Sequence, residues 1–62
     1  MRKFKNGQLV QIRGPYVCIG QVCDYKTYFV FGNFYDIVIK KSSLFSTGEI
    51  HTVAEEFLDA CE

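Results

Sequence analysis

The 62-residue sequence contains no tryptophan, one proline, one histidine and no long hydrophobic run. Its longest apolar stretch, residues 28–31, is far shorter than the roughly 20 residues that a membrane-spanning helix needs, so we expect no membrane partner. Residues 1–7 are basic, but no apolar segment follows them as it would in a secretory signal. We therefore expect one small domain over residues 1–62 in a cytoplasmic protein.

Residues that carry catalytic or metal chemistry are scarce. His51 is the only histidine, and it has no serine or cysteine beside it in a nucleophile motif. Cys18, Cys23 and Cys61 form no C-x-x-C pair, and the spacing of Cys18 and Cys23 on one strand turns them to opposite faces. We interpret the thiols as reduced, and we expect no enzyme activity, no cofactor and no metal site.

Aromatic residues, by contrast, are plentiful: the chain has six phenylalanines and four tyrosines. A domain of this size buries only about 60% of the surface that its unfolded chain exposes. Some of the rings are therefore expected at the surface, where exposed aromatic side chains are typical of a contact site.

Short apolar segments separated by turn residues predict an all-β fold. We expect strands over residues 8–13, 19–25, 28–31, 34–41 and 50–53, with Gly32-Asn33 as a tight hairpin turn. Alternation predicts that Val10 and Ile12 share one face of their strand, and that Tyr35, Ile37 and Ile39 share one face of theirs. Gly20 is expected to form a bulge or a close approach of two strands.

The pattern changes near the C-terminus. Thr52 and Glu55 have the spacing of a capping box, and Val53, Phe57 and Cys61 recur every four residues. These features predict a short acidic amphipathic helix over residues 53–61, which docks on a small barrel over residues 7–53 or on another protein. A two-layer α+β arrangement would accommodate this helix equally well.

Two segments of the chain resemble the KOW motif: residues 7–16, GQLVQIRGPY, and residues 19–22, IGQV. That motif opens the SH3-like barrel of NusG-type transcription factors and of some ribosomal proteins. The similarity continues through Asp24-Tyr25, Phe31-Gly32, residues 37–39 and residues 42–44, so it covers residues 7–44. The first loop is one residue shorter than in the motif, and the 18 residues after Leu44 have no counterpart.

The resemblance implies a mainly β fold, a five-stranded SH3-like (KOW or Tudor-like) barrel, followed here by the short C-terminal helix. In SH3-like barrels, loops and strand ends gather on one side of the barrel. We therefore predict a partner-binding surface formed by Tyr16, Tyr25, Tyr28, Phe34 and Tyr35 with Arg13 and Lys26. The core is expected to take up Phe29 or Phe31, together with Phe45 and Phe57.

Charge is divided along the chain although the total is zero. Residues 1–41 hold seven basic and two acidic residues, a sum of +5, whereas residues 42–62 hold five acidic residues, a sum of −5. The expected helix carries Glu55, Glu56 and Asp59. Its acidic face is either simply solvated or a second interaction surface.

These observations favour a small non-enzymatic binding module that acts as a regulator or inhibitor by docking a protein partner. The resemblance directs attention to the transcription and translation machinery, and the small size suits a phage-encoded protein. The alternative is an accessory protein that binds RNA or DNA through the basic aromatic face of the barrel. We expect a monomer or a homodimer paired along a sheet edge.

Overall fold

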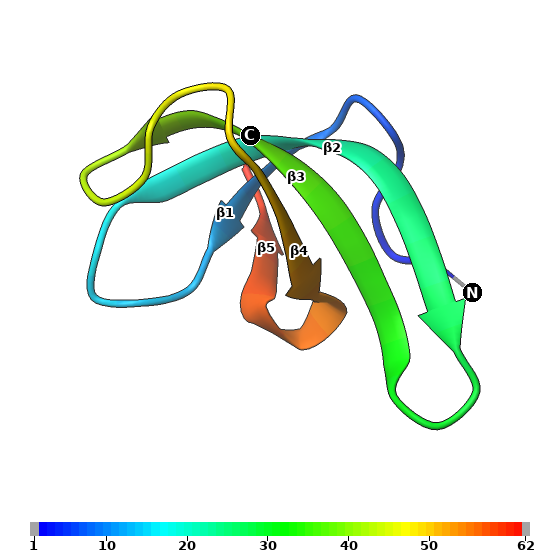
Figure 1. Ribbon diagram of the computed structural model, residues 1–62. Helices are drawn as coiled ribbons and strands as arrows, with labels where there is room; N and C mark the ends of the chain where they lie inside the picture. The colour runs from blue at the N-terminus through cyan, green and yellow to red at the C-terminus, as the bar shows by residue number, and fades with distance from the viewer. Residues whose placement is uncertain (1, 62) are drawn as a thin grey trace.

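A computed structural model describes residues 2–61 (Figure 1). It contains five strands: β1 (Leu9–Ile12), β2 (Cys18–Tyr28), β3 (Gly32–Ser42), β4 (Ile50–Ala54) and β5 (Leu58–Ala60). A single turn of 3₁₀ helix, η1 (Glu55–Phe57), connects the last two strands. All strands belong to one antiparallel sheet with the order β4-β3-β2-β1-β5, so the mainly β prediction is confirmed.

The hairpin of β2 and β3 is the dominant element of the sheet. Each strand has 11 residues, and their ladder runs from the pair Cys18–Ser42 to the pair Tyr28–Gly32. The end of this hairpin projects beyond the other strands (Figure 1). Residues 29–31 form its turn, and Gly32 begins β3 with a φ of 92°. The prediction of a separate strand over residues 28–31, followed by a Gly32-Asn33 turn, is therefore wrong.

The core lies on one face of the sheet, as the alternation of β3 predicts. Tyr35, Ile37 and Ile39 are all fully buried. The buried cluster around Tyr35 and Ile37 also contains Phe4, Val10, Val22 and Leu58, with Ile12, Tyr25 and Val53 packed against it. Phe4 comes from the segment before β1, so residues near the N-terminus help to close the core.

Gly20 lies where β2 and β3 approach each other closely. The ladder shifts register between Ile19 and Gly20. A Cβ atom at position 20 would lie 2.8 Å from the carbonyl oxygen of Val38 and closer still to Cγ2 of Ile37. The prediction of a bulge or close approach at this glycine is confirmed.

The predicted C-terminal helix is wrong. Val53 belongs to strand β4, and after η1 the chain continues as β5, which pairs with β1. The hydroxyl of Thr52 does not cap a helix but donates to Oδ1 of Asp36 at 2.7 Å. An isolated helix of nine residues is marginal in water, whereas pairing with β1 satisfies the backbone and buries Leu58 completely.

The sheet is not closed into a barrel, which corrects the finer part of the fold prediction. Strands β4 and β5 are its two edges, and the short η1 turn joins them without a ladder between them in residues 2–61. Because β5 has only three residues, it offers little edge for such a ladder. Within the same residues, no helix has the length and apolarity needed to cross a membrane.

Candidate binding surfaces

The predicted contact residues do not form one patch, and Tyr35 in particular belongs to the core. Its hydroxyl accepts hydrogen bonds from the amides of Lys3 at 2.8 Å and Phe4 at 3.2 Å. The same hydroxyl donates to Glu55 at 2.6 Å. Burial and this bond raise the pKa of Tyr35, and the bond from the phenol lowers the pKa of Glu55. Tyr35 is therefore a packing residue that ties the N-terminal segment to η1.

Tyr25 is also largely committed inside the molecule. Its ring centre lies 5.1 Å from that of Tyr35, and its hydroxyl donates to Oδ1 of Asn33 at 3.1 Å. The guanidinium carbon of Arg2 lies 4.6 Å from the centre of the ring. The N-terminal segment thus occupies the surface that Tyr25 would otherwise present to a partner.

Tyr28, Phe34 and Lys26 lie together near the end of the β2–β3 hairpin. The rings of Tyr28 and Phe34 meet edge to face with centres 5.6 Å apart. Lys26 forms an ion pair with Asp36 at 3.4 Å. The pKa of Asp36 is lowered, first by the hydrogen bond from Thr52 and then by Lys26. These contacts hold the two strands together close to Tyr28 and Gly32, the last residue pair of the ladder.

Beyond the last residue pair of the ladder lies the most exposed apolar surface of the described chain, which we call the hairpin tip (residues 29–31). Phe29, Val30 and Phe31 have exposed fractions of 105%, 79% and 77%. The prediction that Phe29 or Phe31 packs in the core is wrong, and the tip was absent from the predicted site. Four apolar residues in a row directly before a glycine are the signal that could have revealed it, because a strand turns successive side chains to opposite faces.

Loops 13–17 and 43–49 lie at the other end of the hairpin (Figure 1), and their side chains line a second apolar surface. The loops line an open hollow of about 160 Å³, which we call the loop pocket. Its apolar walls are formed by Ile12, Pro15, Tyr16, Cys18, Leu44 and Phe45. Of the predicted contact residues, only Tyr16 and Arg13 line this pocket, far from the hairpin tip.

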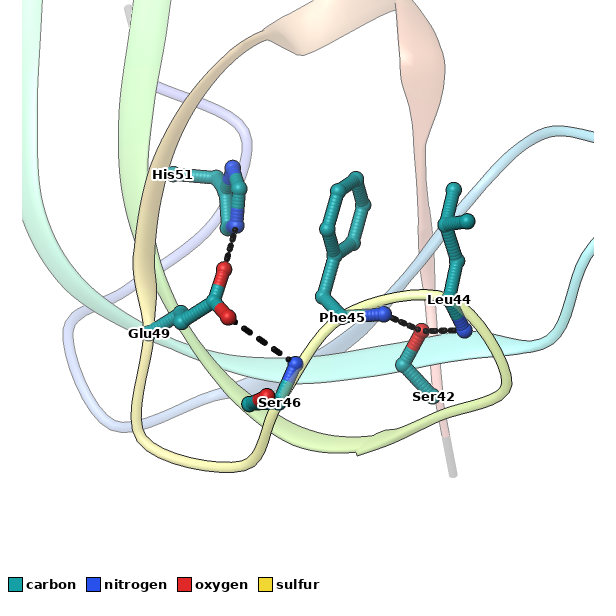
Figure 2. A network of polar contacts seen from close by, with 6 residues as sticks. All are labelled: Ser42, Leu44, Phe45, Ser46, Glu49 and His51. Atoms are coloured by element: carbon teal, nitrogen blue, oxygen red, sulfur yellow. Dashed lines mark hydrogen bonds and ion pairs between the residues drawn. The ribbon is translucent and has the colours of Figure 1, made fainter.

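The 43–49 loop is fixed at its start by a serine hydroxyl. Oγ of Ser42 accepts hydrogen bonds from the amides of Leu44 at 3.0 Å and Phe45 at 3.1 Å (Figure 2). These two bonds hold the backbone of the residues that form one wall of the loop pocket. The pocket is therefore built on an ordered loop.

The end of the same loop is fixed by Glu49. Its carboxylate accepts hydrogen bonds from the Ser46 amide at 3.1 Å and from the His51 ring at 3.0 Å (Figure 2). The bond from His51 is the main cause that lowers the pKa of Glu49. Phe45 is half-buried and packs on His51 with ring centres 4.2 Å apart, but it is not part of the buried core cluster. Phe57, in contrast, is exposed, so its predicted place in the core is wrong.

The acidic C-terminal segment is part of the sheet and not a separate helical face. Arg13 binds Asp59 through two hydrogen bonds of 2.9 Å, which lowers the pKa of Asp59 and raises that of Arg13. Glu55 is bonded to Tyr35, whereas Glu56 of η1 is exposed. The divided charge of the sequence is thus partly neutralised between neighbouring strands.

Cys18, Cys23 and Cys61 are free thiols. Cys18 is buried and Cys23 is exposed, which confirms that they face opposite sides of β2. Among residues 2–61, the cations outside ion pairs are Arg2, Lys3, Lys5, Lys40 and Lys41. They lie in the N-terminal segment and at the loop-pocket end of β3.

No family model, curated protein or solved structure matches this chain.

Proposed function

We propose that the protein is a small non-enzymatic binding module that docks a protein partner through the hairpin tip. The observation that carries this proposal is the exposure of Phe29, Val30 and Phe31, none of which is covered by another element. Contiguous exposed apolar side chains are typical of interaction sites, and aromatic anchors supply much of the binding energy of interfaces.

The stiffness of the hairpin supports the same role. The β2–β3 ladder continues to the pair Tyr28–Gly32, directly next to the tip. The ring pair of Tyr28 and Phe34 and the ion pair of Lys26 and Asp36 hold the strands together below it. A tip that is already ordered loses less conformational entropy on binding than a flexible loop does.

The resemblance to KOW domains supports the choice of partner class. Five antiparallel strands joined largely by hairpins are compatible with an open variant of the SH3-like architecture. We include in the proposal that this fold is related to the SH3-like architecture of KOW domains. The partner class it suggests is a protein of the transcription or translation machinery. In this role the protein would act as a regulator or inhibitor, as a phage-encoded protein of this size could.

Affinity capture with a tip variant tests the proposal. The double variant Phe29→Ser, Phe31→Ser should capture at least tenfold less partner than the wild type, because it removes both aromatic anchors. Ile50→Ser is the matched control, since it removes another exposed apolar side chain far from the tip. Nuclease treatment of the lysate should leave capture unchanged. Undiminished capture by the tip variant would contradict the docking role.

RNA or DNA binding is the alternative function. The five cations outside ion pairs favour it, whereas the pairing of Arg13 with Asp59 and of Lys26 with Asp36 weakens the predicted basic face. Nucleic-acid affinity would fall steeply with added salt. A mobility-shift titration at low salt, with Lys40→Glu, Lys41→Glu as the variant, decides whether this function exists.

A further inference from the structure

The loop pocket has the size of one aromatic ring. Its volume is about 160 Å³, and its walls are largely apolar. A cavity of about 150 Å³ lined by apolar side chains holds one benzene molecule. The pocket can therefore take up one phenyl group.

The phenyl group of Phe29 lacks any aromatic partner in its own molecule. Neither Phe29 nor Phe31 takes part in a ring–ring contact within residues 2–61. The tip and the pocket lie at opposite ends of the 11-residue strand β2, toward the two ends of a molecule whose longest extent is 33 Å. The tip therefore cannot reach its own pocket, whereas it can reach the pocket of another molecule.

The charges near the two ends favour this contact. Lys40 and Lys41 lie at the loop-pocket end of β3 and have no acidic partner within residues 2–61. At the other end, Glu55 and Glu56 line a polar hollow together with Phe31 and Lys3. In that hollow the two carboxylates outnumber the single ammonium group. Lys40 and Lys41 of one copy would thus lie near a hollow of the other copy in which carboxylates are in excess.

We propose that the hairpin tip of one molecule inserts Phe29 into the loop pocket of a second copy. The inference rests on the proposed docking role of the tip and names the partner that its size and charge fit. The contact is head to tail, so each added molecule leaves one tip and one pocket open for further growth. One ring and its neighbours bury much less than the roughly 1,200 Å² of a standard stable interface, so the association is weak and depends on concentration.

Two variants, each lacking one half of the contact, test the proposal. Phe29→Ser removes the aromatic ring that the tip inserts, and Leu44→Asp introduces a charge at the exposed rim of the pocket. In sedimentation velocity, the wild-type protein should form species larger than a dimer as its concentration rises. Each variant alone should remain monomeric. An equimolar mixture should form a dimer and nothing larger, because only one intact tip and one intact pocket remain per pair.

The other outcomes overturn the inference in distinguishable ways. Ile50→Asp, outside both surfaces, should assemble like the wild type. A wild-type protein that stays monomeric up to about 1 mM has no self-association of even the weakest specific class, and the proposal fails. If Leu44→Asp assembles like the wild type, the tip binds elsewhere on the second copy and the pocket assignment fails. Neither result affects capture of another protein by the tip, which is tested separately.

Discussion

The base and the tip of the β2–β3 hairpin have similar apolar composition and opposite environments. At the base, Val22 and Ile37 face each other across the ladder and are buried with Val10 and Leu58. At the tip, residues 29–31 are exposed. The difference comes from the covering elements. Val10 of β1 and Leu58 of β5 pack with Val22 and Ile37, whereas β4 pairs with β3 only as far as Phe34 and no strand covers residues 29–31. Apolar side chains at the base therefore stabilise the fold, while those at the tip remain free to bind.

Truncation at the base should have the largest effect on stability. We predict that Ile37→Ala lowers the free energy of unfolding by about 2–5 kcal/mol, the usual cost of a cavity at a fully buried isoleucine. A chain of this length has a total stability of roughly 3–9 kcal/mol. The variant should therefore be largely unfolded or close to it, as urea titration followed by circular dichroism would measure. A loss below about 1 kcal/mol would mean that the base is not the core.

Removal of the Tyr35 hydroxyl should have the next largest effect. Tyr35→Phe leaves the Glu55 carboxylate and two backbone amides without their shared partner. We predict a loss of about 1–3 kcal/mol in the free energy of unfolding. Tyr28→Phe is the matched control, because its hydroxyl is at the surface and has no hydrogen bond within residues 2–61; it should change stability by less than about 0.5 kcal/mol. If the two substitutions had equal effects, the hydrogen bonds of the Tyr35 hydroxyl would not hold the N-terminal segment to η1.

Acidification should weaken the same connection between the N-terminal segment and η1, because it protonates Glu55, which accepts the hydrogen bond from Tyr35. The folded protein holds the pKa of Glu55 below its ordinary value of 4.5, mainly through the bond from Tyr35. The unfolded chain therefore takes up the proton at higher pH than the folded one, and stability falls as pH drops through the lowered pKa. Above pH 4.5 the contribution of Glu55 is fully present. Chemical denaturation at a series of acidic pH values should show a smaller decline for Tyr35→Phe than for the wild type. An identical decline would assign the acid sensitivity to other carboxylates.

Much of the sheet could be predicted from the sequence, because alternation is a local signal. The shared face of Tyr35, Ile37 and Ile39 in β3 follows from it, and the close approach at Gly20 follows from an equally local signal, a glycine inside a strand. The C-terminal segment could not be predicted in the same way, since Val53, Phe57 and Cys61 fit a helical period equally well. Its pairing with β1 depends on contacts between residues nearly 50 positions apart, such as Val10 with Ala60.

The candidate site was harder to predict than the fold. An aromatic residue in a short β protein can build the core or a surface, and its type does not say which. Tyr35 is predicted at the surface and is buried, whereas one of Phe29 and Phe31 is predicted inside and both are exposed. The deciding factor is the length of the β2–β3 ladder, which carries residues 29–31 beyond the reach of every covering strand.

Substitution at the tip should have the smallest effect on stability and is the sharpest test of the comparison. The double variant Phe29→Ser, Phe31→Ser removes two large rings that contact no part of the core, so its free energy of unfolding should stay within about 0.5 kcal/mol of the wild type. Urea titration beside Ile37→Ala measures this contrast within one hairpin. A loss above about 1 kcal/mol would show that the rings pack within the molecule in solution, and their exposure would no longer support docking. Unchanged stability together with lost binding would separate the two roles, because a substitution that leaves the fold intact can abolish binding only through the surface that it alters.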